Sequence, residues 1–334
     1  MNKSVTFIVP AYNAEKTINN CINSILAQSY PVFEVIIVND GSTDNTLKNL
    51  NEYNNNPKVK IITIKNSGVS VARNIALDNV KTHYVAFVDA DDYISPDFLL
   101  NMIEPYSNSR VDLVVSQINY ISNNSQRVTN YLSGLCDKDD FMMSMFKING
   151  PKGYLWNRLW KMNIIKKYNI RFNETIAMAE DLIFNIDYCK HVREICVLKS
   201  ADYFYVQNST SLSSSIDLTS TQDNYLKIFH DFLISAISAS NKIEPICKRA
   251  YYASRANITI ISLAYLRNIN LKENMFFKFR YRKKIKKIKR VSKAYKNYFF
   301  SSPLVSTKQK ILYFLIMYLP FLLKVIDYRQ KNKS

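Results

Sequence analysis

The chain of 334 residues is poor in glycine, cysteine and histidine. Its 5 glycines and 9 prolines exclude collagen-like and Gly/Pro-rich low-complexity proteins. The 5 cysteines are odd in number and none forms a Cys-X-X-Cys pair, which argues against a disulfide scaffold or a zinc ribbon and favours a reduced, cytoplasmic setting. The 3 histidines have no spacing typical of a metal site or a triad, and no Gly-X-Ser-X-Gly motif occurs, so nothing supports a serine hydrolase.

The sequence also lacks a long apolar run. No stretch reaches the roughly 17–25 residues that a membrane-spanning helix needs. The nearest one covers residues 311–323, which are uncharged but contain Pro320. The first apolar run, at residues 5–9, has the length of a strand, so we expect no secretory signal.

Positive charge is concentrated near the C-terminus. The formal net charge is +18, which would suggest a nucleic-acid-binding protein if the charge were evenly spread. Residues 1–150 carry 12 Lys/Arg and 15 Asp/Glu, residues 151–270 carry 15 and 10, and residues 271–334 carry 18 and 2. The main body is therefore close to neutral, and the basic tail is expected to have a partner of its own.

The first hundred residues alternate between strand and helix patterns. Apolar or β-branched runs cover residues 5–9, 34–38, 59–64 and 84–88, and helical spacing follows the first three of them. This alternation predicts a doubly wound α/β domain, in which ligands bind at the carboxyl edge of the strands. Four polar loops are expected to meet there, at residues 10–13, 39–44, 66–74 and 89–92.

The pattern is weaker beyond residue 110. We expect a strand at 113–118, a short helix at 141–146, a loop entering a helix over 155–167, a helix at 183–189 and a strand at 201–206. From about residue 222 the sequence is helical and aromatic in character, without strand alternation.

Asp89 and Asp91 follow directly after the run at 84–88, in the sequence Asp-Ala-Asp-Asp. Two carboxylates one residue apart can present oxygens to one hard cation, and Mg²⁺ or Mn²⁺ commonly bridges such groups to substrate phosphates. The same residues also suit a turn or a helix start. Their place after a buried strand favours the cation site.

Three other segments each have both a structural and a functional interpretation. Asp40 could cap the next helix or accept a hydrogen bond from a nucleobase. Gly68 lies near a helix start, where backbone N–H groups can face a phosphate, and Arg73 on that helix is either a surface residue or aimed at the phosphate. Glu180 and Asp181 suit the N-terminus of an apolar helix, and equally a general base in a cleft.

The segment GYLWNRLWK, at residues 153–161, also has two interpretations. Core packing is favoured for its aromatic residues. The alternative is that Trp156 stacks on a sugar while Arg158 contacts a phosphate.

Four ordered segments together resemble the nucleotide-sugar domain of the family 2 inverting glycosyltransferases, which have the GT-A fold. They are VTFIVPAYNAEKTINNCINSILAQSY, EVIIVNDGSTDNT, NSGVSVARN and YVAFVDADD. The resemblance is close over residues 3–110 and looser to about 210. It implies a Rossmann-like, doubly wound mixed sheet, followed here by a helical C-terminal region.

The resemblance also implies roles for residues of this sequence. The uridine pocket would be lined by Pro10, Ala11, Tyr12, Asn13 and Asp40. The ribose and diphosphate would lie near Gly68, Arg73 and Asn74. The DxD motif would be Asp89, Ala90 and Asp91, with Asp91 as the direct ligand of Mn²⁺ or Mg²⁺ and Asp89 as the second carboxylate.

On the acceptor side, Asp181 matches the family's catalytic base. Glu180 would assist with the acceptor, and Trp156 and Arg158 are placed on the same side. A Q/RxxRW-type motif is not evident, which favours the addition of one sugar per encounter over processive polymerisation.

The basic tail predicts an amphipathic helix. Residues 278–290 contain nine Lys/Arg, and Phe277, Tyr281, Ile285 and Ile288 form an apolar stripe beside them. This combination suits an anionic membrane surface. A nucleic acid, an anionic glycopolymer, or a helical subdomain or oligomer contact with a solvated basic face remain alternatives.

These expectations combine into one interpretation. Residues 1–215 would form the GT-A domain and residues 216–334 a helical region, with a membrane-associating tail at about 275–330. The protein would transfer a hexose or N-acetylhexosamine from a UDP-sugar to a hydroxyl of a lipid-linked saccharide or a cell-surface polymer, in capsule, exopolysaccharide or wall-polymer synthesis. It would be cytoplasmic and peripheral on the inner face of the membrane, with no nucleic-acid partner, and a homo-oligomer is left open. The alternatives are a non-catalytic nucleotide-sugar-binding module and a nucleic-acid-binding protein that uses the tail.

Overall fold

The computed structural model describes residues 3–31, 33–122, 125–145, 150–151, 153–175 and 180–207, together with Asn297, Phe300, Thr307, Lys310, Ile311 and Phe314. The chain separates into two compact units. The first contains residues 1–145, 149–215 and 238–240, and the second contains 146–148, 216–237 and 241–334. Every described strand belongs to the first unit. The boundary expected at 215/216 and the amphipathic stripe of the tail lie outside the described residues and stay predictions.

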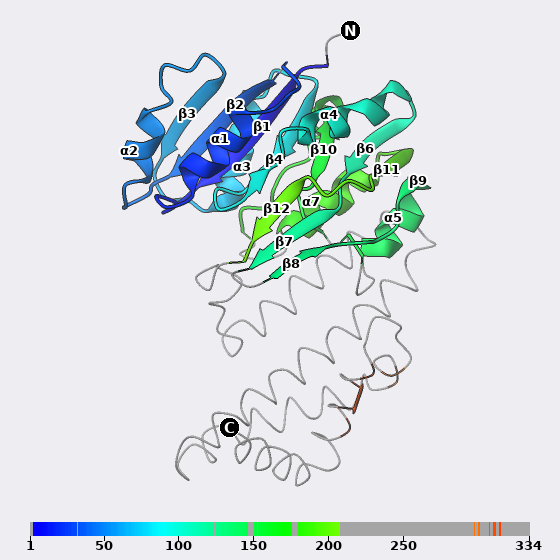
Figure 1. Cartoon of the computed structure of the whole chain (residues 1–334). Coiled ribbons are helices and arrows are strands. Elements are labelled where there is room, and N and C mark those ends of the chain that lie inside the picture. The colour runs from blue at the N-terminus through cyan, green and yellow to red at the C-terminus, as the bar shows by residue number, and fades with distance from the viewer. Residues whose placement is uncertain are drawn as a thin grey trace, which may run out of the picture. The chain divides into compact units, whose positions relative to one another are not determined.

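An eight-stranded mixed sheet forms the centre of this unit, in the order β3-β2-β1-β4-β10-β6-β11-β9 (Figure 1). Four neighbouring strands are parallel: β1 (Val5–Ala11), β2 (Phe33–Asp40), β3 (Val59–Ile64) and β4 (Tyr84–Phe87). The other half contains β6 (Val111–Val115), β9 (Gly134–Asp137), β10 (Arg158–Lys161) and β11 (Glu194–Val197). β10 runs antiparallel to both β4 and β6.

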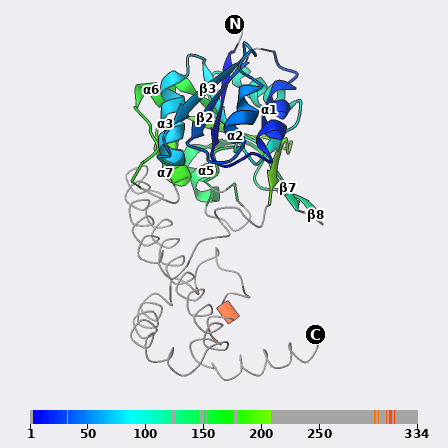
Figure 2. The ribbon, with the colours of Figure 1, turned by 90° about the vertical axis from the view of Figure 1, so that its left-hand side faces the viewer.

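Helices cover both faces of the parallel strands. α1 (Ile18–Leu26) and α2 (Thr46–Asn51) lie on one side, and α3 (Val69–Asn79) lies on the other (Figure 2). This arrangement follows from the strand order, because right-handed crossovers place the helix on the opposite face when the chain reverses its direction across the sheet. Ile18, Cys21, Ile22 and Ile25 recur at helical spacing and are fully buried.

A smaller sheet, ordered β5-β12-β7-β8, also belongs to this unit. Its strands are β5 (Tyr93–Ile94), β7 (Ile118–Ser122), β8 (Ser125–Val128) and β12 (Tyr203–Val206). The remaining helices are α4 (Phe98–Ile103), a 3-10 turn at Glu104–Ser107, α5 (Lys138–Met145), α6 (Met162–Lys167) and α7 (Glu180–Cys189). Among the described residues, no helix is both long and apolar enough to cross a membrane.

The fold confirms the doubly wound, mixed α/β prediction, but two local predictions were wrong. The strand expected at 113–118 is two strands, because Ser116 and Gln117 leave the large sheet and donate their N–H groups to Asn157 O and Ser200 O. The loop expected from residue 155 contains β10. Arg158, Leu159 and Trp160 are all fully buried, so this strand has no alternation by which it could be recognised.

Candidate active site

The four loops at the carboxyl edge of β1–β4 are joined to one another by hydrogen bonds. The Asn13 N–H donates to Ser42 Oγ at 3.0 Å, and the Thr43 N–H donates to Asn13 Oδ1 at 2.8 Å, which joins the first loop to the second. Asp40 joins the second loop to the third, and Arg73 joins the third to the fourth. The structure therefore brings together the loops that the strand pattern placed at one edge.

Asp40 holds the third loop through its carboxylate. Oδ1 accepts the Ser67 N–H at 2.7 Å, and Oδ2 accepts the Gly68 N–H at 2.8 Å. The interpretation of Asp40 as a cap of the next helix is wrong, because α2 begins after Asn45 and the Thr46 N–H donates to Asp44. Its interpretation as an acceptor for a nucleobase stays a prediction. Two bonds do not exhaust the four lone-pair sites of a carboxylate, so Asp40 keeps acceptor capacity toward a ligand.

Gly41 is required where the second and third loops approach each other. Its φ is +65°, and a Cβ at this position would lie 2.5 Å from Asn66 N and 3.1 Å from Asn66 Cα. Both contacts are with backbone, which has little room to move. The neighbouring Asp40 is thus able to reach the N–H groups of Ser67 and Gly68 only because residue 41 has no side chain.

We expect Gly41→Ala to lower the free energy of unfolding by about 2 kcal/mol or more, through this overlap together with the left-handed backbone. Gly134→Ala is the matched control, because Gly134 also has a positive φ of +105° but no atom lies within 4 Å of its Cβ position. Urea unfolding followed by tryptophan fluorescence measures both, since the two tryptophans of the chain, Trp156 and Trp160, are buried in this unit. Equal losses in the two variants would contradict the close approach.

Arg73 on α3 lies at the centre of a cluster of carboxylates. Its guanidinium pairs with Asp181 Oδ1 at 2.7 Å, with Glu180 Oε1 at 3.0 Å and with Asp89 Oδ1 at 3.3 Å. The Arg73 side chain is 5% exposed, and Asp89 and Asp181 are 29% and 26% exposed. A single buried cation therefore joins the carboxyl edge of β4 to the first turn of α7, which is more than a hundred residues away in the sequence. We call these four residues the Arg73 cluster.

The charges of the Arg73 cluster do not balance, and this changes their pKa values. Burial lowers the pKa of Arg73, but its three carboxylate neighbours outweigh that effect, so its pKa is raised and it stays charged. Burial raises the pKa of Asp181 to about 7, with Arg73 opposing the shift and Glu180 adding to it. Burial also raises the pKa of Asp89, again against Arg73. Asp181 is therefore a carboxylate poised to take up a proton near neutral pH.

Asp91 is the carboxylate of this region that remains available to a cation. No hydrogen bond or ion pair joins its side chain to another described residue, whereas Asp89 is already paired with Arg73. Burial and the neighbouring Asp89 raise the pKa of Asp91 to about 6. The described residues contain no group of three or more His, Cys, Asp or Glu suited to a metal ion. Asp91 and Asp89 nevertheless fit Mg²⁺ or Mn²⁺, which is commonly held by one or two carboxylates together with substrate phosphates.

The other residues expected at the donor site have varied surroundings. Pro10 and Ala11 end β1, Tyr12 is 49% exposed and Asn13 has a positive φ of 49°. Gly68 is the residue before α3, and Ala90 is buried in the loop after β4. Asn74 exchanges hydrogen bonds with the backbone of Phe172 and also donates to Glu174 Oε1, so its amide holds the segment that leads toward α7.

Trp156 and Arg158 are buried, as the core interpretation of this segment requires. Trp156 is 3% exposed and stacks on Tyr154, Tyr203 and Tyr205 at ring distances of 4.7, 4.3 and 5.3 Å. Arg158 is fully buried, donates to Pro151 O and lies over the Phe141 ring. An acceptor-side role for these two residues stays a prediction.

Sequence reasoning missed the hydrogen bonds that join the loop after β4 to strand β12. Asp92 is 1% exposed and accepts hydrogen bonds from the Tyr203 hydroxyl and the Val206 N–H. The three aspartates in Asp-Ala-Asp-Asp were a visible signal, but Tyr203, the partner of Asp92, lies 111 residues further along the chain.

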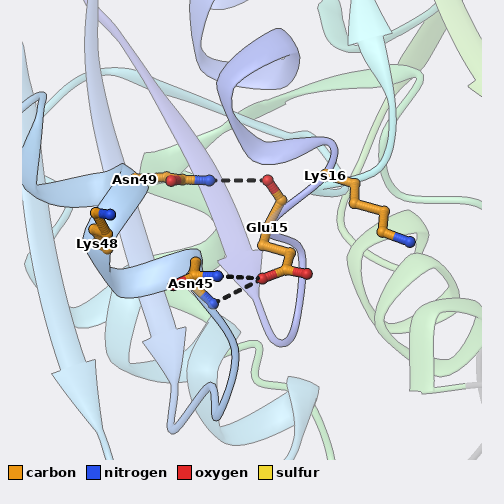
Figure 3. Close-up of a pocket in the computed structure, with 5 residues that line it drawn as sticks. All are labelled: Glu15, Lys16, Asn45, Lys48 and Asn49. Carbon is orange, nitrogen blue, oxygen red and sulfur yellow. Dashed lines mark hydrogen bonds between the residues drawn. The ribbon is translucent and has the colours of Figure 1, made fainter.

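A separate cavity of about 340 Å³ lies beside the loops after β1 and β2 (Figure 3). It is lined by Glu15, Lys16, Asn45, Lys48 and Asn49. Glu15 Oε2 accepts from both the backbone and the side chain of Asn45, and Asn49 donates to Glu15 O. These bonds join the two loops on the side of α2, and no residue of the Arg73 cluster takes part.

Comparison with known proteins identifies the family. The family described as glycosyl transferase family 2 matches residues 6–174, half of the chain, and the chain belongs to it. An uncharacterized glycosyltransferase, EpsJ of Bacillus subtilis, is 28% identical over 63% of this chain and 62% of its own length. TarS of Staphylococcus aureus, a poly(ribitol-phosphate) beta-N-acetylglucosaminyltransferase, is 29% identical over 65% of this chain and 38% of its own length. The chain thus spans less than two thirds of these curated relatives.

Solved structures agree on the fold. S. aureus TarS 1-349 in complex with UDP-GlcNAc superposes with a TM-score of 0.66 and 21% identity, covering 93% of this chain and 86% of that one. A mannosyltransferase from Pyrobaculum calidifontis, in complex with GDP-Man and Mn²⁺, superposes with a TM-score of 0.54 and 16% identity, covering 96% and 88%. The first unit therefore has the GT-A fold that the sequence motifs implied.

Proposed function

We propose that this protein is an inverting glycosyltransferase. It moves a hexose or N-acetylhexosamine from a UDP-sugar to a hydroxyl of a lipid-linked saccharide or a cell-surface polymer. The observation that carries the proposal is the Arg73 cluster. In it, the Arg73 guanidinium pairs both with Asp181, the carboxylate expected to act as base, and with Asp89, the first aspartate of the DxD motif.

The donor side is supported by the linked loops. The uridine would lie against residues 10–13 and Asp40, and the diphosphate would lie toward Gly68 and Asp91. TarS, whose fold this chain shares, was solved with UDP-GlcNAc, which makes a UDP-sugar the first donor to test. Mn²⁺ or Mg²⁺ held by Asp91, with Asp89 beside it, would neutralise negative charge on the departing diphosphate.

The acceptor side is supported by the environment of Asp181. Arg73 orients this carboxylate, and the raised pKa matches a base that works near neutral pH. Asp181 would take the proton of the acceptor hydroxyl as its oxygen forms a bond to the anomeric carbon and the bond to the diphosphate breaks. One displacement inverts the anomeric configuration, so an α-linked donor yields a β-linked product.

The pH dependence follows from the pKa of Asp181. A base must be deprotonated, so kcat/KM should rise with pH and level off above an apparent pKa of about 7. The measurement is kcat/KM as a function of pH between about 5 and 9, at saturating metal. A profile that is flat across this interval would remove Asp181 from the role of base.

The acceptor and the location are proposed from the tail. A basic amphipathic helix within residues 275–330 would hold the protein on the inner face of the membrane, close to a lipid-linked saccharide. TarS is named as a transferase acting on poly(ribitol-phosphate), so an anionic wall polymer is the other acceptor to test. The chain would divide into a catalytic domain, 1–215, and a helical region, 216–334.

Donor screening tests the proposed function. Purified protein is incubated with Mn²⁺ and a panel of UDP-sugars, and UDP release is recorded with and without EDTA. We expect slow hydrolysis of one donor, lost with EDTA and in Asp91→Ala. Release that is indifferent to both treatments would contradict the proposed metal site.

A further inference from the structure

The small sheet holds the loop that carries the DxD aspartates, residues 89–92, which we call the aspartate loop. Tyr203 on β12 is fully buried. Its hydroxyl donates to Asp92 Oδ2 at 2.7 Å and accepts the Asp89 N–H at 3.2 Å. One oxygen atom therefore contacts both the first and the last residue of the aspartate loop.

The position of that hydroxyl is itself fixed. The Tyr203 ring stacks on Trp156 at 4.3 Å and contacts the Phe98 ring edge-on at 6.4 Å. Its strand is paired on both sides, with β5 and with β7. Because β5 begins at the residue after Asp92, the same strand also fixes the exit of the aspartate loop.

The aspartate loop has few other supports. The Asp92 N–H donates to Asp89 O at 3.0 Å, and the Cys21 thiol donates to the same oxygen at 3.5 Å. The Asp89 side chain pairs with Arg73, and the Val206 N–H donates to Asp92 Oδ1 at 2.8 Å. Asp91 lies between the two residues that Tyr203 contacts and has no side-chain partner among the described residues. Its direction is therefore set by the backbone on either side of it.

We propose that Tyr203 is a positioning residue, which holds the aspartate loop so that Asp91 faces the cation and the diphosphate. This inference rests on the proposed function. Tyr203 touches neither donor nor metal in this account, and acts through the Asp89 amide and the Asp92 carboxylate. The small sheet thus contributes to the donor site although none of its strands belongs to the parallel half of the large sheet.

Tyr203→Phe tests this, because it removes the hydroxyl and keeps the stacked ring. Tyr188→Phe is the matched control. Tyr188 is also fully buried, donates to a main-chain oxygen, Asp112 O, at 2.7 Å and accepts the Lys161 N–H at 2.8 Å, but it lies away from the aspartate loop. A general loss of stability would affect both variants.

Two readouts separate positioning from stability. Amide hydrogen exchange in a peptide covering residues 85–93 should be faster in Tyr203→Phe than in wild type, and unchanged in Tyr188→Phe. The Mn²⁺ concentration for half-maximal UDP binding should rise about tenfold in Tyr203→Phe, the size expected when a buried hydrogen bond is lost and its partner is left unsatisfied, and stay within about twofold in the control.

The outcomes are distinct. Equal exchange and equal Mn²⁺ dependence in the two variants would overturn the inference. If wild type binds no UDP with Mn²⁺, the proposed function fails. The exchange experiment then still decides whether Tyr203 holds the aspartate loop, and unchanged exchange in Tyr203→Phe overturns that too.

Discussion

Asp181→Asn should reduce sugar transfer by about 10²–10⁴-fold, the usual contribution of a general base. The asparagine is nearly the same size and can still accept a hydrogen bond from Arg73, but it cannot take up the acceptor proton. Donor affinity should therefore stay close to that of wild type. The measurement is the initial rate of UDP release at saturating donor, beside UDP affinity from calorimetry.

Asp187→Asn is the matched control for this substitution. It lies on the same helix, α7, but its carboxylate pairs with Lys190 at 2.6 Å instead of Arg73. The control should keep the rate of wild type. Normal transfer by Asp181→Asn would show that another residue is the base.

Arg73→Met should be the most destabilising of the substitutions considered. Removing one partner of a buried ion pair leaves charge uncompensated and typically costs about 3–5 kcal/mol. Here three carboxylates would lose their shared cation. Urea unfolding followed by the fluorescence of Trp156 and Trp160 gives the change in the free energy of unfolding.

The loss should also depend on pH in a defined direction. Burial already raises the folded-state pKa values of Asp89 and Asp181, and Arg73 opposes both shifts, so without Arg73 these two pKa values rise further above their unfolded values. The stability that such groups contribute is fully present below the unfolded pKa and is lost as pH rises through the folded pKa. The free energy of unfolding of the variant should therefore be lower at pH 8 than at pH 5. Arg171→Met is the control, because Arg171 pairs with Asp78 at the surface, with side chains 33% and 60% exposed. That pair should contribute less than about 1 kcal/mol. Similar losses in both variants would contradict the central place of Arg73.

The parallel half of the fold could be predicted because its strands and loops are marked by patterns of residues that are neighbours in the sequence. Residues 34–38 form a continuous apolar run, as a strand buried on both faces requires, and the polar loops follow such strands directly. The same logic placed Asp89 and Asp91 at the carboxyl edge. The general position of α7 was also readable, since Glu180 and Asp181 stand before an apolar helical stretch.

The contacts between distant segments could not be predicted in this way. Nothing in the spacing of residues shows that Arg73 reaches a pair of acids more than a hundred residues later, or that Asp92 meets Tyr203. The sequence left Arg73 as either a surface residue or a residue aimed at phosphate. The surface interpretation is wrong, because the Arg73 side chain is 5% exposed and pairs with three carboxylates, and the phosphate role stays a prediction. β10 escaped notice because a strand buried on both faces, with an arginine in it, carries no periodic signal.

The pairing within the Arg73 cluster also bears on where a metal ion would bind. Arg73 pairs with Asp89, Glu180 and Asp181, and Asp92 is bonded to Tyr203 and to the Val206 N–H. Asp91 is therefore the carboxylate of residues 89–92 that has no side-chain partner among the described residues. A donor diphosphate would bring negative charge to the same edge of the sheet. Binding of the metal and of the diphosphate should therefore depend on each other, as two opposite charges in one site do.

UDP binding measured by calorimetry is the most direct test of this account. With Mn²⁺ present, wild type should bind UDP, and the binding should be lost on addition of EDTA and strongly weakened in Asp91→Ala. Binding that is unaffected by EDTA and by Asp91→Ala would contradict the assignment of the metal to Asp91. No binding of UDP under any of these conditions would contradict the central claim that this protein is a UDP-sugar transferase.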